Sequence, residues 1–300
     1  MCHPLLAARQ TAAGLTVLLS LALLQGAAGQ TLGPVRVAID RVEYQQVDGL
    51  SLTLDLYLPQ DGKKNRPAVV WLHGGGFSGG KPSQFQPQSE SLASFGVVCA
   101  SVRYRLTGEA PFPACIQDAK AAVRFFRANA EKYGVDPNRI AVGGGSAGGH
   151  LAAMVGLTPG EFEGQGPNLQ TSSRADLLIL YNPALDLREL GKAAERSKRA
   201  GDRRPGAADL ARWSPITHVS ANAPPTLILH GDQDTTVPYR QAVSFRDALA
   251  AQGVKVELFT AEGKGHSWFN RPPDLQTTTR RVVQFLKQNG FWPAPDETAS

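Results

Sequence analysis

The 300-residue sequence predicts an α/β fold built on a mostly parallel sheet with helices on both faces. Six short segments support this prediction because they are almost continuously apolar, as strands are when both faces of a parallel sheet are covered. Helical patterns alternate with these segments, which indicates a doubly wound sheet with its functional site at the carboxyl ends of the strands. The six segments are residues 68–72, 97–103, 139–142, 177–180, 226–229 and 254–260.

The first 29 residues have the three regions of a secretory signal peptide. Residues 1–9 carry one basic side chain and no acid, residues 15–24 are mostly apolar, and residues 25–29 offer small side chains for cleavage. The apolar run is shorter than the roughly 20 residues that span a bilayer. We therefore expect a soluble protein, secreted or periplasmic, with residues 30–300 as a single domain. The alternative is an uncleaved anchor or an extra helix.

The elements outside the six segments follow from periodicity and helix-stop signals. Two opening strands are predicted within residues 33–61, where Leu52, Leu54, Leu56 and Leu58 alternate with polar residues and share one face. Each predicted helix is followed by a glycine that can end it. These helices cover residues 113–133, 239–252 and 274–289.

Two segments, 158–171 and 186–213, fit neither a strand nor a core helix, because they are rich in Gly, Pro and charge. Both are expected to leave strand ends on the functional side, as a lid or rim or as ordinary surface loops. From Arg188 to Arg204 there are seven basic and three acidic residues, and no other long basic face is left for nucleic acid. We expect a solvated insertion, with contact to an anionic wall polymer or a membrane as the alternative.

Two cysteines remain after residue 29. Cys99 lies in a predicted strand and Cys115 near the start of a predicted helix. An exported protein can form a disulfide, but such positions usually hold inert packing residues, which is our expectation here. No CxxC motif or spaced Cys/His set is present, so we predict no metal and no cofactor.

A glycine-rich stretch, residues 142–150, reads Val-Gly-Gly-Gly-Ser-Ala-Gly-Gly-His between a predicted strand and an alanine-rich helical stretch. Its Gly144-x-Ser146-x-Gly148 pattern is typical of a nucleophile elbow, a strained turn that holds a serine hydroxyl in the open. Ser146 is therefore the candidate nucleophile. The alternative is a turn that only closes the connection, because motifs this short have many chance matches.

Residues at three other strand ends can supply the groups that a serine nucleophile needs. Those groups are a general base, an acid that orients the base, and donors for an oxyanion. The stretch His-Gly-Gly-Gly-Phe at residues 73–77 follows one strand and can turn backbone N–H groups inward. Asp232 and Asp234 follow a second strand, and His266 follows a third.

The order Ser, Asp, His at successive strand ends resembles the α/β-hydrolase superfamily. The pairing of HGGGF with GGSAGGH resembles its hormone-sensitive-lipase-like and feruloyl-esterase-like (BD-FAE type) branches, from about Leu52 to about Phe285. The resemblance implies the α/β-hydrolase fold, with a central sheet of about eight strands. Gly145 stands where the lipase-like branch usually has an acidic residue, which departs from that branch but leaves the elbow intact.

The same resemblance implies a serine carboxylic-ester hydrolase that acts through an acyl-enzyme. Ser146 is then the nucleophile and His266 the base, while Asp234 matches the acid of an HGxxDxxVP segment and Asp232 shapes its loop. The backbone N–H groups of the oxyanion hole are expected to be those of Gly75, Gly76 and Ala147.

The remaining ring-bearing residues near the motifs have two interpretations. We expect His73 to brace its own loop, and we expect His150, His218 and His230 to be structural, because one well-placed base suffices. Three aromatic residues after strand ends are candidates for a substrate pocket, although packing explains them equally well. They are Phe77, Tyr181 and Trp268.

The predicted substrates are small esters or the acetyl or feruloyl decorations of plant polysaccharide, as the resemblance and the export signal jointly suggest. A serine peptidase-like enzyme and a non-catalytic binding protein on the same scaffold are the alternatives. We predict no nucleic-acid partner and no stable membrane span, and leave the oligomeric state open.

Overall fold

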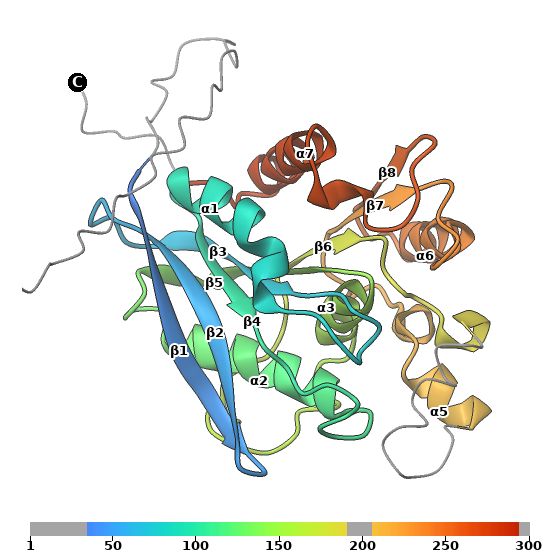
Figure 1. Cartoon of the computed structure of the whole chain (residues 1–300), viewed down its shortest axis with the longest axis horizontal. Coiled ribbons are helices and arrows are strands. Elements are labelled where there is room, and N and C mark those ends of the chain that lie inside the picture. Colours follow the sequence, from blue (N-terminus) through green and yellow to red (C-terminus); the bar gives the residue numbers. More distant parts are fainter. Residues whose placement is uncertain (1–34, 191–205, 294–300) are drawn as a thin grey trace, which may run out of the picture. The chain divides into compact units, whose positions relative to one another are not determined.

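A single eight-stranded sheet runs through the part of the chain that the computed structural model describes, residues 35–190 and 206–293. The strand order is β1-β2-β4-β3-β5-β6-β7-β8, and the six strands from β4 to β8 in that order are parallel (Figure 1). β1 pairs antiparallel with β2, and β2 with β4. The predicted mostly parallel sheet of about eight strands is confirmed. The strands are β1 (Val37–Val47), β2 (Leu50–Pro59), β3 (Arg66–Leu72), β4 (Val98–Val102), β5 (Val135–Gly145), β6 (Leu177–Tyr181), β7 (Thr226–Gly231) and β8 (Val256–Ala261).

The burial of the strands follows their hydrophobic patterns. Every residue of β3, β4, β6 and β7 is buried, as continuous apolar runs predict for strands covered on both faces. In β2 the alternating pattern puts Leu52, Leu54 and Leu56 in the core with no exposed surface, while Leu58 is only partly buried. The core therefore lies on both sides of the sheet.

Helices cover both faces, as predicted (Figure 1). On one face lie α2 (Ala114–Ala128), α3 (Ala147–Leu157) and α6 (Arg240–Ala251), whose apolar side chains share one core cluster. On the other face lie α1 (Gln86–Ser94) and α7 (Asp274–Gln288). Sequence periodicity did not indicate α1, because Leu92 and Ala93 are its only apolar residues and Gln88 and Ser89 are buried beside them.

Short helices complete the chain. The 3-10 turns are η1 (Pro82–Phe85), η2 (Leu187–Leu190), η4 (Pro215–His218) and η5 (Trp268–Asn270), and a short α-helix, α5, spans Ala207–Arg212. None of the helices within the described ranges has the length and apolarity needed to cross a bilayer. The predicted signal peptide, residues 1–29, lies outside the described residues and stays a prediction.

One expectation about the two Gly/Pro-rich segments is wrong. Segment 158–171 follows helix α3 rather than a strand. It therefore starts at the edge of the sheet opposite the carboxyl ends of the strands. It then returns along α2, because Lys120 and Arg124 hold Glu163, and a side chain at Gly164 would meet Gln117 in the early part of that helix. Segment 186–213 does follow a strand region, after β6, but residues 191–205 lie outside the described ranges.

Both described cysteines are free and buried. Burial raises the pKa of the Cys99 and Cys115 thiols well above the ordinary value, which suppresses the reactive thiolate. This agrees with the expectation of packing residues.

Candidate active site

Three polar side chains from distant parts of the sequence meet at the carboxyl ends of neighbouring strands. Ser146 directly follows β5, Asp234 lies three residues after β7, and His266 lies in the loop after β8. Because these strands are parallel and β6 separates β5 from β7, their carboxyl ends all open at the same edge of the sheet. The fold therefore gathers all three residues at one place.

The three side chains form one hydrogen-bonded chain. His266 Nε2 lies 2.9 Å from Ser146 Oγ, and His266 Nδ1 lies 2.7 Å from Asp234 Oδ2. A carboxylate can only accept, so Nδ1 carries the ring hydrogen and Nε2 is left as the acceptor for the serine hydroxyl. This tautomer lets the imidazole take a proton from Ser146.

Asp234 is held in its ionised form by donors on both oxygens. Its Oδ1 accepts the amides of Thr236 and Val237, each at 2.9 Å. Its Oδ2 faces His230 Nε2 at 3.2 Å as well as His266. Burial alone would raise the pKa of Asp234, but the hydrogen bonds from His230, His266 and the Val237 amide hold that pKa well below the ordinary value.

The neighbouring Asp232 has a different partner. Its Oδ1 accepts the Gly263 amide at 2.8 Å, which ties the loop after β7 to the loop after β8. Among the described residues, Asp232 forms no hydrogen bond with His266, whose Nδ1 partner is Asp234. The structure thus places Asp234, and not Asp232, beside the histidine.

The turn around Ser146 has the strained geometry that the glycine pattern predicts. Ser146 has a φ of 56°, in the left-handed region that non-glycine residues seldom adopt. A side chain at Gly148 would meet the Leu72 carbonyl oxygen at 2.0 Å and the His73 carbonyl oxygen at 2.5 Å. The first turn of α3 therefore packs directly on the backbone at the end of β3, and only glycine permits this approach.

Free backbone donors lie beside the serine. A Cβ atom at Gly74 would stand 3.4 Å from Ser146 Cβ, so the 73–77 loop lies against the elbow. None of the hydrogen bonds recorded within the described ranges uses the amide of Gly75, Gly76 or Ala147. Gly75 and Gly76 are also exposed. These three amides are available to an oxygen bound at the site, as the resemblance implies for an oxyanion hole.

Two further residues position this loop and the acid: Gln84, which sequence reasoning missed, and His230, which it expected to be structural without naming its partner. Gln84 Oε1 accepts the Gly74 amide at 2.5 Å, which fixes the start of the glycine run. His230 is fully buried, and its Nε2 lies 3.0 Å from the Val237 carbonyl as well as near Asp234. The four-residue spacing from His230 to Asp234 was a usable signal, whereas nothing in the sequence around Gln84 marks it.

The other histidines are engaged in structural contacts. His73 stacks on Tyr104, and its Nδ1 bonds the Gly74 carbonyl at 2.9 Å, which is the expected brace. His150 Nε2 lies 2.6 Å from the Trp213 carbonyl, so that nitrogen carries the hydrogen. Burial lowers the pKa of His150 to about 4. His218 Nε2 bonds the Arg212 carbonyl at 2.7 Å.

The glycine at position 145 has a local explanation. A Cβ atom there would meet Phe269 Cζ at 2.9 Å and Phe85 Cζ at 3.5 Å. Phe85 and Phe269 are both buried, and their rings pack on each other with centroids 5.9 Å apart. Two phenylalanine rings thus occupy the space into which an acidic side chain would extend.

The three aromatic candidates for a substrate pocket lie in different surroundings. Phe77 belongs to the 73–77 loop, and its ring contacts His150 and Phe112 at centroid distances of 5.1 and 5.3 Å. Tyr181 is fully buried against Phe269 and Trp71, which favours the packing interpretation over a place in a substrate pocket. Trp268 is partly buried and stacks on Phe259 at 6.1 Å.

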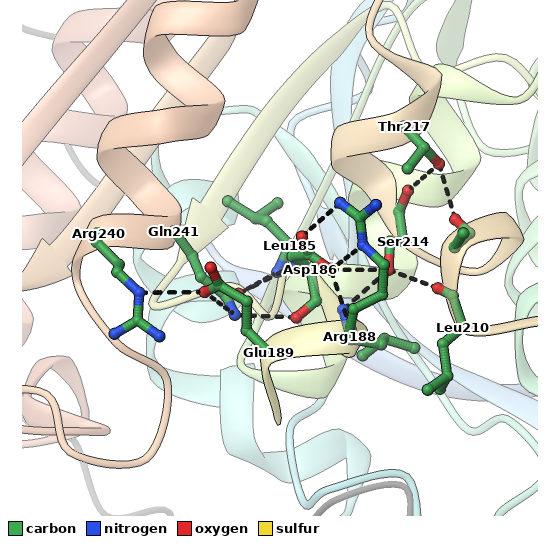
Figure 2. A network of polar contacts seen from close by, with 11 residues as sticks. Leu185, Asp186, Arg188, Glu189, Leu210, Ser214, Thr217, Arg240 and Gln241 are labelled. Atoms are coloured by element: carbon green, nitrogen blue, oxygen red, sulfur yellow. Dashed lines mark hydrogen bonds and ion pairs between the residues drawn. The ribbon is translucent and has the colours of Figure 1, made fainter. Parts of the chain in front are cut away.

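The ends of segment 186–213 are fastened to each other and to α6 (Figure 2). The buried Ser214 Oγ accepts the Leu187 amide at 2.9 Å and donates to the Leu210 carbonyl at 2.6 Å. Gln241 Oε1 accepts the amides of Leu185 and Asp186, at 2.9 and 3.1 Å. This network fixes α5 and the following Trp213, whose carbonyl is bonded to His150 of α3.

Within the described ranges, no group of three or more His, Cys, Asp or Glu side chains could hold a metal ion.

Comparison with known proteins adds a family. A family model described as BD-FAE matches residues 54–249, more than half of the chain, and one described as TAP-like protein matches residues 209–299. Esterase LipC of Mycobacterium tuberculosis is 33% identical over 75% of this chain and 59% of its own length. Carboxylesterase NlhH of the same species is 31% identical over 83% of this chain and 82% of its own length. The chain spans about half the length of three of the curated relatives that it matches.

Solved structures show the same fold. The butyrate-bound esterase Est2 of Thermogutta terrifontis superimposes with a TM-score of 0.75, at 35% identity over 86% of this chain and 95% of that one. The same esterase phosphorylated by paraoxon gives a TM-score of 0.74 at 34% identity, over 85% of this chain and 96% of that one. The α/β-hydrolase fold that the resemblance implies is confirmed by this similarity.

Proposed function

The chain belongs to the BD-FAE family of the α/β-hydrolase superfamily, and from that premise we propose that it is a serine carboxylic-ester hydrolase. Esterases and carboxylesterases are the relatives and solved structures to which it is similar. The single observation that carries the proposal is the bonded chain from Ser146 Oγ through His266 to Asp234, with the free amides of the 73–77 loop beside it.

The first half-reaction transfers the acyl group to the enzyme. Ser146 Oγ forms a bond to the ester carbonyl carbon while its proton passes to His266 Nε2. The carbonyl oxygen becomes an oxyanion, and the amides of Gly75, Gly76 and Ala147 stabilise its charge. When the carbon–oxygen bond to the alcohol breaks, the imidazolium gives its proton to the leaving oxygen. An acyl ester on Ser146 remains.

The second half-reaction frees the enzyme by the same steps. Water gives a proton to His266 Nε2 and attacks the acyl carbon, and the proton returns to Ser146 Oγ as that bond breaks. The products are the carboxylic acid and the original serine. Asp234 stays ionised throughout and stabilises the imidazolium without taking its proton. Its lowered pKa suits this role.

We place the enzyme outside the cytoplasm, because residues 1–29 have the pattern of a cleaved signal peptide. Its substrates are small esters or the acetyl or feruloyl groups of plant polysaccharide. Export supports this choice, because polymeric substrates do not enter cells. Export is tested by expressing the full chain with its leader and sequencing the N-terminus of the exported protein. A start near residue 30 supports export. Protein that stays in the cell pellet and still begins with Met1 contradicts it.

The activity is tested with nitrophenyl esters from acetate to palmitate, methyl ferulate and acetylated xylan. Wild-type protein should hydrolyse at least one class, and Ser146→Ala should lower kcat by about 10⁶-fold, the usual cost of removing the nucleophile of such a triad. The profile across the panel identifies the acyl preference. A folded wild-type protein that cleaves none of these esters contradicts the proposal.

Paraoxon offers a test that does not depend on the choice of ester. It phosphorylates the similar Est2 of Thermogutta terrifontis. We expect one diethyl phosphoryl group on Ser146, found by intact-mass and peptide analysis, and none on Ser146→Ala. Labelling of another residue contradicts the assignment of the nucleophile.

A further inference from the structure

The glycine run beside Ser146 has no side chains of its own to pack, so other groups must hold its shape. Gly75 and Gly76 have φ values of 129° and 60°, in the region that favours glycine. Such residues lose more backbone freedom on folding than any others. Donors stabilise an oxyanion best when they are aimed before the charge forms. The peptide planes of this run therefore need an external support.

The support begins at Gly74, both of whose backbone polar groups are bonded. Its carbonyl oxygen lies 2.9 Å from His73 Nδ1, and its amide donates to Gln84 Oε1 at 2.5 Å. The next two amides along the chain, those of Gly75 and Gly76, have no partner within the described ranges. The fixed peptide group of Gly74 thus lies directly before the free donors.

Gln84 reaches the loop from a firmly anchored turn. It belongs to η1, and the next residue of that turn, Phe85, is fully buried. The Phe85 ring stacks on Trp71 of β3, the strand that leads into the glycine run, with ring centroids 4.7 Å apart. Gln84 therefore holds the Gly74 amide from a fixed point of the core.

The same turn contacts the other parts of the reaction centre. Phe85 packs on Phe269, which lies three residues after His266, with centroids 5.9 Å apart. A Cβ atom at Gly145, the residue before the nucleophile, would stand 3.5 Å from Phe85 Cζ. Through two adjacent side chains, η1 thus contacts the oxyanion loop, the histidine loop and the elbow.

The carboxamide of Gln84 has one bonded atom and one free atom. The side chain is partly buried, and its oxygen holds the Gly74 amide. Among the hydrogen bonds of residues 35–190 and 206–293, none uses its Nε2. A Cβ atom at Gly74 would stand 3.4 Å from Gln84 Oε1 and 3.4 Å from Ser146 Cβ, so the oxygen lies close to the nucleophile. The contact that the structure shows is made by the oxygen alone.

From these contacts we infer that Gln84 is a positioning residue of the oxyanion hole. It acts through Gly74 to aim the amides of Gly75 and Gly76, and it touches no reacting atom itself. The inference rests on the proposed function and deepens it. Removal of one oxyanion donor lowers turnover by about 10²- to 10³-fold. Loss of the support that aims two donors should cost part of that, about 10- to 100-fold, because the donors remain present but misdirected.

Variants at position 84 test whether the carboxamide oxygen is the atom that matters. Gln84→Met has a similar length and no acceptor, and it should lower kcat on 4-nitrophenyl acetate about 10- to 100-fold, with KM changed by less than about twofold. Gln84→Glu keeps an acceptor for the Gly74 amide. Its loss should stay below about fivefold at high ionic strength, which screens the added charge.

The matched control is Gln86→Met, the same substitution two residues further on. Gln86 is exposed and its side chain bonds only Glu90, so both kinetic constants should be unchanged. Equal losses in Gln84→Met and Gln84→Glu, or a rise of KM in place of the fall of kcat, overturn the inference. Circular dichroism and the melting temperature establish folding. Gln84→Ala, which also lacks the acceptor, provides the test if Gln84→Met is unfolded.

A trifluoromethyl ketone probes the oxyanion hole without a leaving group. Ser146 Oγ adds to its carbonyl carbon while the serine proton passes to His266, and the carbonyl oxygen becomes an oxyanion that stays bound. In Gln84→Met the inhibition constant should rise by the same factor by which kcat/KM falls. An unchanged inhibition constant overturns the inference, because the loss of rate would then arise elsewhere.

A measurement without substrate separates failure of this inference from failure of the proposed function. Isotopic labelling of histidine carbonyl carbons and glycine nitrogens marks two peptide groups in the sequence, His73–Gly74 and His230–Gly231. In Gln84→Met the Gly74 amide resonance should shift and exchange faster with water, while that of Gly231 stays unchanged. An unchanged Gly74 amide overturns the inference even if the wild type is an esterase. The expected change in a protein that cleaves no ester supports the role of Gln84 in shaping the loop and contradicts the esterase.

Discussion

At the Ser146 centre the polar side chains are bound to one another, whereas in the cavity lined by Gln117, Phe162 and Trp213 only some of the polar side chains have partners. Asp234 has donors on both carboxylate oxygens, and His266 has a partner on each ring nitrogen. In the cavity, the side chains of Gln117 and Gln165 have no hydrogen-bond partner among the described residues. The side chains at the Ser146 centre are thus positioned by hydrogen bonds to one another before any ligand is bound.

The largest break in the bonded centre should come from Asp234→Asn. The amide keeps the shape of the carboxylate but favours the wrong imidazole tautomer, so kcat on 4-nitrophenyl acetate should fall about 10⁴-fold. Asp232→Asn is the matched control, because Asp232 holds only the Gly263 amide, and it should retain activity within a few fold. Equal losses in both variants would show that Asp234 is not the orienting acid.

A smaller effect concerns His150, which joins the two regions through the Trp213 carbonyl. Its folded pKa of about 4 lies below the unfolded value of 6.5, so the unfolded chain binds more protons in between. The stability that the neutral His150 contributes is therefore fully present above pH 6.5. It is lost as the pH falls toward 4, which lowers the free energy of unfolding by about 3 kcal/mol.

Urea unfolding at pH 7 and pH 4.5 measures that loss. His150→Gln keeps a donor for the Trp213 carbonyl but does not titrate, so its stability should change much less between these two pH values. If His150→Gln lost as much stability between pH 7 and pH 4.5 as the wild type, other groups would be responsible for the acid sensitivity.

The smallest expected effect concerns Ser214, which fastens segment 186–213 on the cavity side of this comparison. Ser214→Ala removes the hydroxyl that joins Leu187 to Leu210 and leaves a buried amide without a partner. We expect a loss of stability of about 1–3 kcal/mol, measured by urea unfolding. Thr217→Val, which removes a more exposed hydroxyl of the same network, is the control (Figure 2). A loss as large in Thr217→Val would show that the Leu187 amide does not depend specifically on the Ser214 hydroxyl.

The sequence predicted the bonded centre better than the cavity for a physical reason. Ser146, Asp234 and His266 each lie at the end of a strand with a recognisable apolar pattern, and parallel strands bring their carboxyl ends to one edge. Each residue could therefore be placed from its local surroundings. The sheet itself was predictable on the same grounds.

The cavity depends on contacts that have no local pattern. Phe162 and Arg212 come from segments without periodicity, and they meet because buried cations of α2 hold Glu163 and because Ser214 and Gln241 fasten the other segment. The sequence left Tyr181 open between pocket and core because a residue at a strand end can point to either, and its burial favours the core. Helix α1 was missed because its buried side chains include Gln88 and Ser89.

The space beside Gly145 limits how this protein can change by single substitutions. An acidic residue at that position would collide with Phe269 Cζ at 2.9 Å, so it becomes tolerable only after Phe269 has been replaced by a smaller residue. That first replacement would leave a void against Phe85 and Tyr181 and lower stability by about 3–5 kcal/mol. Both orders of mutation pass through a poor intermediate, and the two positions are therefore epistatic: a designer who wants the lipase-like acid here must change them together.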